Sequence, residues 1–142
     1  MPYPRSLMRV RHFFSSKSNY MGVTRKEAFV KVSVFRVEDA YGKGPYESDS
    51  PIIAAMNAMH GNADHPSPAE DPMLGHVYPT ENCCFATLCE LEEWFAGYED
   101  DLADAGYEIS VYTVPLDHVR YGKQQAVFRR GDTYPVRTMS MR

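Results

Sequence analysis

The residues best suited to chemistry begin near the end of an apolar run, Ala28 to Val37, whose β-branched and aromatic content predicts a strand. Arg36 and Glu38 lie two positions apart, so their side chains point to one face of that strand. A guanidinium can hold a pyrophosphate by paired hydrogen bonds, and a fixed carboxylate can offset positive charge on a reacting sugar. The plainer alternative is a solvated ion pair between the two side chains.

Two further polar residues could belong to the same site. Gln125 lies in the segment Tyr121 to Phe128. Its amide can donate and accept hydrogen bonds but carries no charge, so it can hold a ribose without neutralising a cation. His65 opens the motif His-Pro-Ser-Pro in a proline-rich loop, residues 62–80, of the kind that lies on the surface or over a cleft. Its imidazole could act in acid–base chemistry, or it could fix the loop by bonding a backbone group.

A metal site is not expected, although histidines and cysteines occur close together in the sequence. A structural zinc site needs four ligands, commonly supplied as tight pairs, and the spacing from His60 to His65 across a glycine does not provide one. The three cysteines, at positions 83, 84 and 89, lack the spacing of a zinc site and are odd in number. We therefore expect reduced thiols rather than a disulfide framework.

The remaining patterns predict a single α+β domain. A serine cap followed by proline starts a helix at residues 50–61, and Thr87 caps a second helix that carries an apolar stripe. Strands are expected at residues 107–114, 119–121 and 125–129. Residues 1–28 are basic and lack a sustained period, so they are expected to form an N-terminal arm before a domain that spans residues 29–142.

Three segments, taken in order, resemble parts of the ADP-ribosyltransferase fold found in poly-ADP-ribose polymerases and related bacterial toxins. The segment Phe35–Val37 is similar to an early strand that presents a basic residue to the dinucleotide. The segment Cys84–Thr87 is similar to a central element that precedes a helix. The segment Gln124–Phe128 is similar to a late strand that opens with the catalytic glutamate. The resemblance implies a split β-sheet with two main helices and NAD as the cofactor.

The resemblance also implies roles for individual residues. The NAD-binding residues would be Arg36, Phe85 and Thr87. Gln125 would hold the family's catalytic position. Beside it, the residues themselves suggest Glu38 as the source of the missing negative charge and His65 as an acid–base group, which completes the candidate catalytic set. Because glutamine stands where the family places its glutamate, we expect a degenerate ADP-ribosyltransferase, for which residual transfer and plain nucleotide binding both stay open. Either activity requires Arg36 and Gln125 to converge on one hollow.

The chain also resembles small phage and prophage proteins with the patterns Arg-Val-Glu, Gly-Pro-Tyr and His-Pro-x-Pro, found at residues 36–38, 44–46 and 65–68. This likeness implies a mobile-element origin and no particular activity. The leading hypothesis is therefore a phage or mobile-element accessory protein whose NAD-binding cleft binds or modifies a host factor. Without an apolar run near the roughly 20 residues that span a bilayer, we expect a cytoplasmic protein of the host cell with no membrane partner.

The distribution of charge suggests alternatives from other classes. Residues 1–36 carry a net charge of +7, residues 37–119 of −16 and residues 120–142 of +5. The acidic middle argues against direct nucleic-acid binding, although the basic arm could contact single strands or dimerise in an assembly factor. Acidic residues there could instead imitate a DNA backbone and inhibit a host defence complex, in the manner of an anti-CRISPR or DNA-mimic protein. They are Glu90, Glu92, Glu93, Glu99, Asp100, Asp101 and Asp104.

Overall fold

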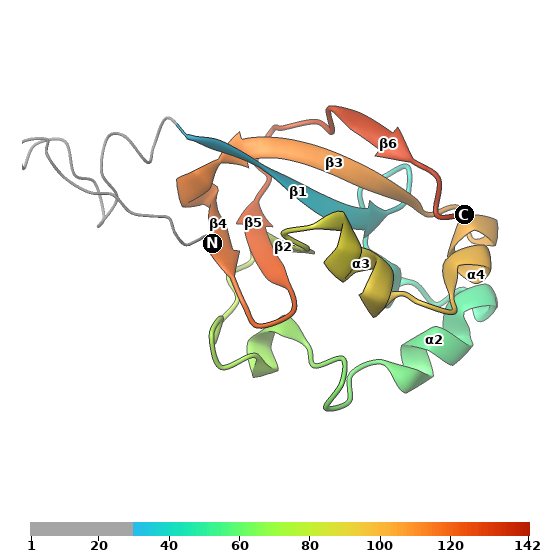
Figure 1. Cartoon of the computed structure of the whole chain (residues 1–142). Helices are drawn as coiled ribbons and strands as arrows, with labels where there is room; N and C mark the ends of the chain where they lie inside the picture. Colours follow the sequence, from blue (N-terminus) through green and yellow to red (C-terminus); the bar gives the residue numbers. More distant parts are fainter. Residues whose placement is uncertain (1–29) are drawn as a thin grey trace, which may run out of the picture.

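The predicted first strand is β1 (Lys31–Glu38) in the computed structural model, which describes residues 30–142 (Figure 1). The basic arm predicted at residues 1–28 lies outside the described residues. β1 pairs antiparallel with β3 (Glu108–Pro115) along its whole length. The short edge strand β6 (Arg137–Met139) pairs with β3 on its other side and completes a three-stranded sheet in the order β1-β3-β6.

A second antiparallel sheet has the order β2-β5-β4. Its strands are β2 (Glu81–Cys84), β5 (Ala126–Arg129) and β4 (Val119–Tyr121). The two sheets are joined by a β-bridge, in which Phe35 on β1 and Phe85 after β2 exchange backbone hydrogen bonds of 2.9 and 2.8 Å. The described part is thus one small mixed α/β domain in which β1 belongs to one sheet and touches the other.

Within residues 30–142, three short helices replace the two longer ones expected. They are α2 (Ala54–Met59), α3 (Leu88–Trp94) and α4 (Glu99–Asp104). Single 3-10 turns occur at η3 (Pro45–Glu47), η4 (Pro51–Ile53), η5 (Pro68–Glu70) and η6 (Leu116–His118). The predicted cap of α3 is confirmed, because Thr87 Oγ1 accepts a hydrogen bond of 3.1 Å from Glu90 N. Gly97, whose φ is 92°, separates α3 from α4, and no helix in residues 30–142 is long and apolar enough to cross a bilayer.

Alternate residues of β1 and β3 point to opposite sides of their sheet. Buried side chains pack on both of these sides. Val34 and Tyr112 pack in a cluster with Phe128 of the second sheet. Val37 and Ile109 belong to another cluster, together with residues of the three helices. The helical members of that cluster are Met56, Leu91, Trp94 and Leu102. Figure 1 shows α2 and α4 at the end of the domain opposite β4 and β5.

The loop between α2 and β2 is held against the hairpin formed by β4 and β5. The buried carboxylate of Asp71 accepts a hydrogen bond of 2.8 Å from the backbone N–H of Lys123, at the hairpin turn. Arg120 on β4 donates to the carbonyl oxygens of Leu74 and His76 at 2.7 and 2.8 Å. This proline-rich segment, expected on the surface or over a cleft, is therefore anchored along its length by one hairpin.

The close approach of the loop to the hairpin predicts that position 122 admits only glycine. A Cβ atom on Gly122 would lie against Asp71 Oδ2 and 2.8 Å from Gln125 O. We expect Gly122→Ala to lower the free energy of unfolding by about 1–3 kcal/mol in urea denaturation, because Asp71 must shift away from its hydrogen-bond donors. Lys123→Ala is the control, since it keeps the bound N–H and should cost less than about 0.5 kcal/mol. An equal loss in both variants would contradict the proposed packing.

Candidate functional site

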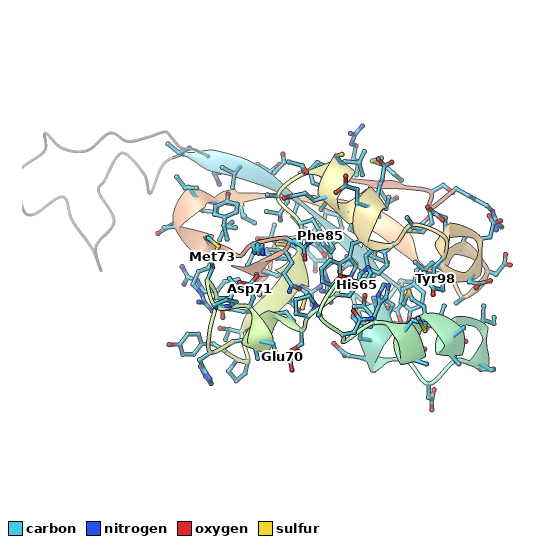
Figure 2. All side chains as sticks on the ribbon, turned by 60° about the horizontal axis from the view of Figure 1, so that its bottom comes forward. His65, Glu70, Asp71, Met73, Phe85 and Tyr98 are labelled. Atoms are coloured by element: carbon cyan, nitrogen blue, oxygen red, sulfur yellow. The ribbon has the colours of Figure 1, made fainter. Side chains whose placement is uncertain are left out.

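A cavity of about 480 Å³ is lined by residues of β1, η3, α2, β2, α3 and the loop after α2. Its volume lies within the roughly 300–1,000 Å³ typical of small-molecule sites. Six of the residues that line it carry aromatic rings, and polar side chains lie among them. It includes Arg36, Tyr46, Asn57, His60, His65, Phe85, Trp94, Phe95 and Gln125. Figure 2 shows His65 and Phe85 in the middle of the molecule, where they contribute to this lining.

The predicted convergence of Arg36 and Gln125 is present, because both side chains line this cavity. They are 5% and 6% exposed and come from opposite ends of the described chain. Gln125 Nε2 donates to the carbonyl oxygen of Pro66 at 2.8 Å, which leaves its Oε1 atom as an acceptor for a ligand. Phe85 and His65 also line the cavity, so four of the six predicted site residues meet at one place.

Arg36 is held by three protein acceptors. Its Nε donates to Glu38 Oε1 at 2.8 Å, its Nη1 to Cys83 O at 2.8 Å and its Nη2 to Gly42 O at 3.1 Å. These bonds tie β1 to β2 and to the loop that follows β1. A guanidinium has five N–H groups, so two remain after these three bonds.

Glu38 lies outside the cavity lining and is buried in a charged cluster. Its Oε1 atom accepts from Arg36 and, at 3.1 Å, from Arg130, and its Oε2 atom accepts from Tyr112 Oη at 2.5 Å. Burial, and then the neighbouring Glu38 carboxylate, raise the pKa of Tyr112. The alternative of a solvated Arg36–Glu38 ion pair is therefore correct about the pairing but wrong about its exposure, because both side chains are buried. Thr87 also lies outside the lining, and its side chain caps α3.

The two histidines of the cavity form a stacked pair. The rings of His60 and His65 lie 3.9 Å apart with an angle of 9° between their planes. His65 also meets the ring of Trp94 edge-on at 4.8 Å. Tyr46 stacks on Phe95 with the ring centres 6.2 Å apart. The imidazole of His65 thus fixes the loop by stacking on rings rather than by the expected bond to a backbone group.

A chain of hydrogen bonds defines which nitrogen of His60 carries a proton. Trp94 Nε1, which can only donate, donates to Tyr46 Oη at 2.7 Å. The hydroxyl proton of Tyr46 is then directed to His60 Nδ1, 2.5 Å away, which assigns the imidazole proton to Nε2. Burial, and then the charge of His65, lower the pKa of His60 to about 4, while burial raises the pKa of Tyr46. The cavity therefore presents a neutral imidazole with an N–H donor.

The side chain of Asn57, a residue of the cavity lining, holds a buried hydrogen-bond acceptor. Its Nδ2 atom donates to the carbonyl oxygens of Pro45 and Ser48 at 3.3 and 3.4 Å. Its Oδ1 atom is buried and has no hydrogen-bond partner within residues 30–142. Because this oxygen has almost no accessible surface, it faces protein atoms rather than the open cavity, and leaving it unsatisfied costs the fold about 1–3 kcal/mol.

Several of these lining residues were not predicted from the sequence to belong to a site. Tyr46 belonged to the Gly-Pro-Tyr pattern of the phage resemblance, while Trp94 and Phe95 belonged to the apolar stripe of a helix. The stripe has two functions in the structure, because both aromatic residues are buried in the core and line the cavity. The signal that could have found them is the unusual aromatic content of one face of that helix.

Beside the main cavity lies a smaller one of about 120 Å³, with His65 and Trp94 in the lining of both. The rest of its lining is acidic or polar: Asp64, Glu90, Glu93 and Gln124. Across the described residues, no three His, Cys, Asp or Glu side chains are grouped so as to hold a metal ion. The smaller cavity is thus a pocket of negative charge beside an aromatic one.

The acidic face that suggested a DNA mimic is partly paired with a basic residue. On α4, Asp100 and Asp104 lie 3.5 and 3.1 Å from Arg142 near the end of the chain. On α3, Glu92 and Glu93 are exposed. The DNA-mimic role stays a prediction.

The buried cluster around Glu38 gives a prediction about stability. Glu38→Ala would leave Arg36 and Arg130 without their shared carboxylate. Removing one partner of a buried ion pair typically costs about 3–5 kcal/mol, and we expect a loss of that order in urea denaturation. The matched control is Glu108→Ala, because Glu108 lies opposite Glu38 on β3 and is exposed. A similar loss in both variants would show that the buried pairing is not the cause.

The lowered pKa of His60 predicts a dependence of stability on pH. A histidine in the unfolded chain has a pKa near 6.5, whereas that of folded His60 is about 4. Between these values the unfolded chain binds more protons, so stability is full above about pH 6.5 and is lost as the pH falls toward 4. His60→Gln should lose less stability than the unmodified protein between about pH 7 and about pH 5 in urea denaturation. His118→Gln, outside the cavity, is the control, and identical pH profiles for all three proteins would refute the assignment.

Comparison with known proteins identifies the family. The family model described as Bacteriophage T4 Y00F protein matches residues 26–142. No curated protein and no solved structure gives a significant match. The expected phage origin is confirmed, and the expected ADP-ribosyltransferase architecture is not. Since the match spans most of the sequence, the chain belongs to the Bacteriophage T4 Y00F protein family.

Proposed function

We propose that this phage protein binds a small ligand with a planar ring in the 480 Å³ cavity, and that nucleotides such as NAD are the first candidates. The observation that carries the proposal is the meeting of aromatic walls with the buried side chains of Arg36 and Gln125 in one hollow. Stacking of a base on an aromatic side chain is worth about 1–3 kcal/mol, so Trp94, Phe85 and Tyr46 would supply much of the affinity.

The function proposed is binding rather than transfer of ADP-ribose. Transfer develops positive charge on the ribose and needs a nearby anionic group to stabilise it. Gln125 is neutral, and the carboxylate of Glu38 already accepts from Arg36, Arg130 and Tyr112. A carboxylate engaged by three donors is poorly placed to approach a sugar. A phage protein that binds a nucleotide in this way would act in the infected cell, by withholding the ligand or by presenting it to a host protein.

The proposal predicts a spectroscopic response, because Trp94 is the only tryptophan of the chain and lines the cavity. Titration with NAD, ADP-ribose, adenosine or nicotinamide should change its fluorescence in a saturable way and raise the melting temperature. Cys83→Phe should abolish both effects by filling the cavity from β2. Cys89→Phe, also at an exposed cysteine but outside the lining, should preserve them. If no compound produces either response at about millimolar concentration, the proposal fails.

A further inference from the structure

Most polar side chains that line the main cavity carry no charge, and its one basic side chain, Arg36, is buried and bonded to protein acceptors. Gln125 offers its Oε1 atom as an amide acceptor, and His60 is a neutral imidazole with its proton on Nε2. The charge of Arg36 is offset in part by Glu38, whose Oε1 atom lies 2.8 Å from Arg36 Nε and is shared with Arg130. A ligand that matches these groups must offer both donors and acceptors at its edge and needs no charge of its own, which is the pattern of a nucleobase.

The surroundings of the cavity are negatively charged. Glu47 belongs to the lining of the main cavity. The smaller cavity, which shares His65 and Trp94 with the main one, contains the carboxylates of Asp64, Glu90 and Glu93. Arg36 is the only Lys or Arg in the lining of either cavity within residues 30–142, and it is paired.

This arrangement is unfavourable for phosphate. A phosphate monoester carries about −1.5 to −2 charges at neutral pH, and it requires basic side chains or free backbone N–H groups. A nucleotide seated in the cavity would instead bring its phosphate close to several carboxylates. The repulsion between the phosphate and carboxylates closer than the Debye length, which is about 8 Å at physiological salt, is only partly screened.

We propose that the ligand of this cavity is an uncharged nucleobase or nucleoside, and that phosphorylated forms of the same compound bind more weakly. This inference rests on the proposed function and defines its ligand class more narrowly. The aromatic rings would stack on the base, while Gln125 and His60 contact its polar edge. Ligands with a pyrophosphate, NAD among them, would bind through their ring despite the repulsion between their phosphates and these carboxylates.

The test compares each of the four ribonucleosides with its 5′-monophosphate on the full-length protein, by calorimetric titration supported by the fluorescence of Trp94. We expect at least one nucleoside to bind and its monophosphate to bind about tenfold more weakly or worse at low salt. The difference should narrow at about 0.5 M salt, because screening weakens repulsion.

Paired variants separate the charge effect from packing. Asp64→Asn combined with Glu93→Gln should raise the affinity for the monophosphate, since two carboxylates of the smaller cavity become neutral. Glu92→Gln, exposed on the same helix and outside both linings, should leave the ratio of the two affinities unchanged.

The outcomes distinguish the inference from the function on which it rests. A monophosphate that binds as tightly as its nucleoside, or more tightly, overturns the inference while ligand binding in the cavity stands. Binding of NAD without binding of any nucleoside has the same consequence. If no nucleoside, nucleotide or dinucleotide binds, the proposed function fails together with the inference.

Discussion

The buried charge of Arg36 is the constraint around which the site is arranged. A guanidinium taken out of water is costly unless a carboxylate and further acceptors replace the solvent. Glu38 supplies the charge, and the carbonyl oxygens of Cys83 and Gly42 supply the remaining acceptors. Because these groups come from β1, β2 and the loop after β1, satisfying one side chain brings three segments together. The cavity lies beside this junction, so its shape depends on an ion pair that does not itself need to touch a ligand.

The elements that could be predicted are those whose signals are local. β-Branched and aromatic residues indicated β1, alternating apolar residues indicated β3, and the strands expected at residues 119–121 and 125–129 correspond to β4 and β5. β2 could not be found in this way, because the segment Glu81–Cys84 has neither β-branched nor aromatic residues and is a strand through its pairing with β5. The division between α3 and α4 depends on the positive φ of Gly97, where the sequence allowed either an interrupted helix or a continuous one.

The candidate site shows the same limit at the level of side chains. Arg36, Phe85, His65 and Gln125 were chosen for their types and do meet at one cavity, whereas the burial of Glu38 was not foreseen. Strand periodicity correctly placed Arg36 and Glu38 on one face but could not say that Arg130 and Tyr112 would close over that face. Asn57 and Tyr46 could not be assigned at all, because their roles arise from contacts between segments distant in the sequence.

The anchoring of the loop between α2 and β2 has a consequence for how anything could enter the cavity. Pro66, Leu74 and the side chain of Asp71 are all bonded to residues of the β4–β5 hairpin. Three attachments to one rigid element prevent this loop from swinging aside as an independent flap. A ligand must therefore enter through the existing opening of the cavity. Otherwise the loop and the hairpin must move together and break the pairing of β5 with β2.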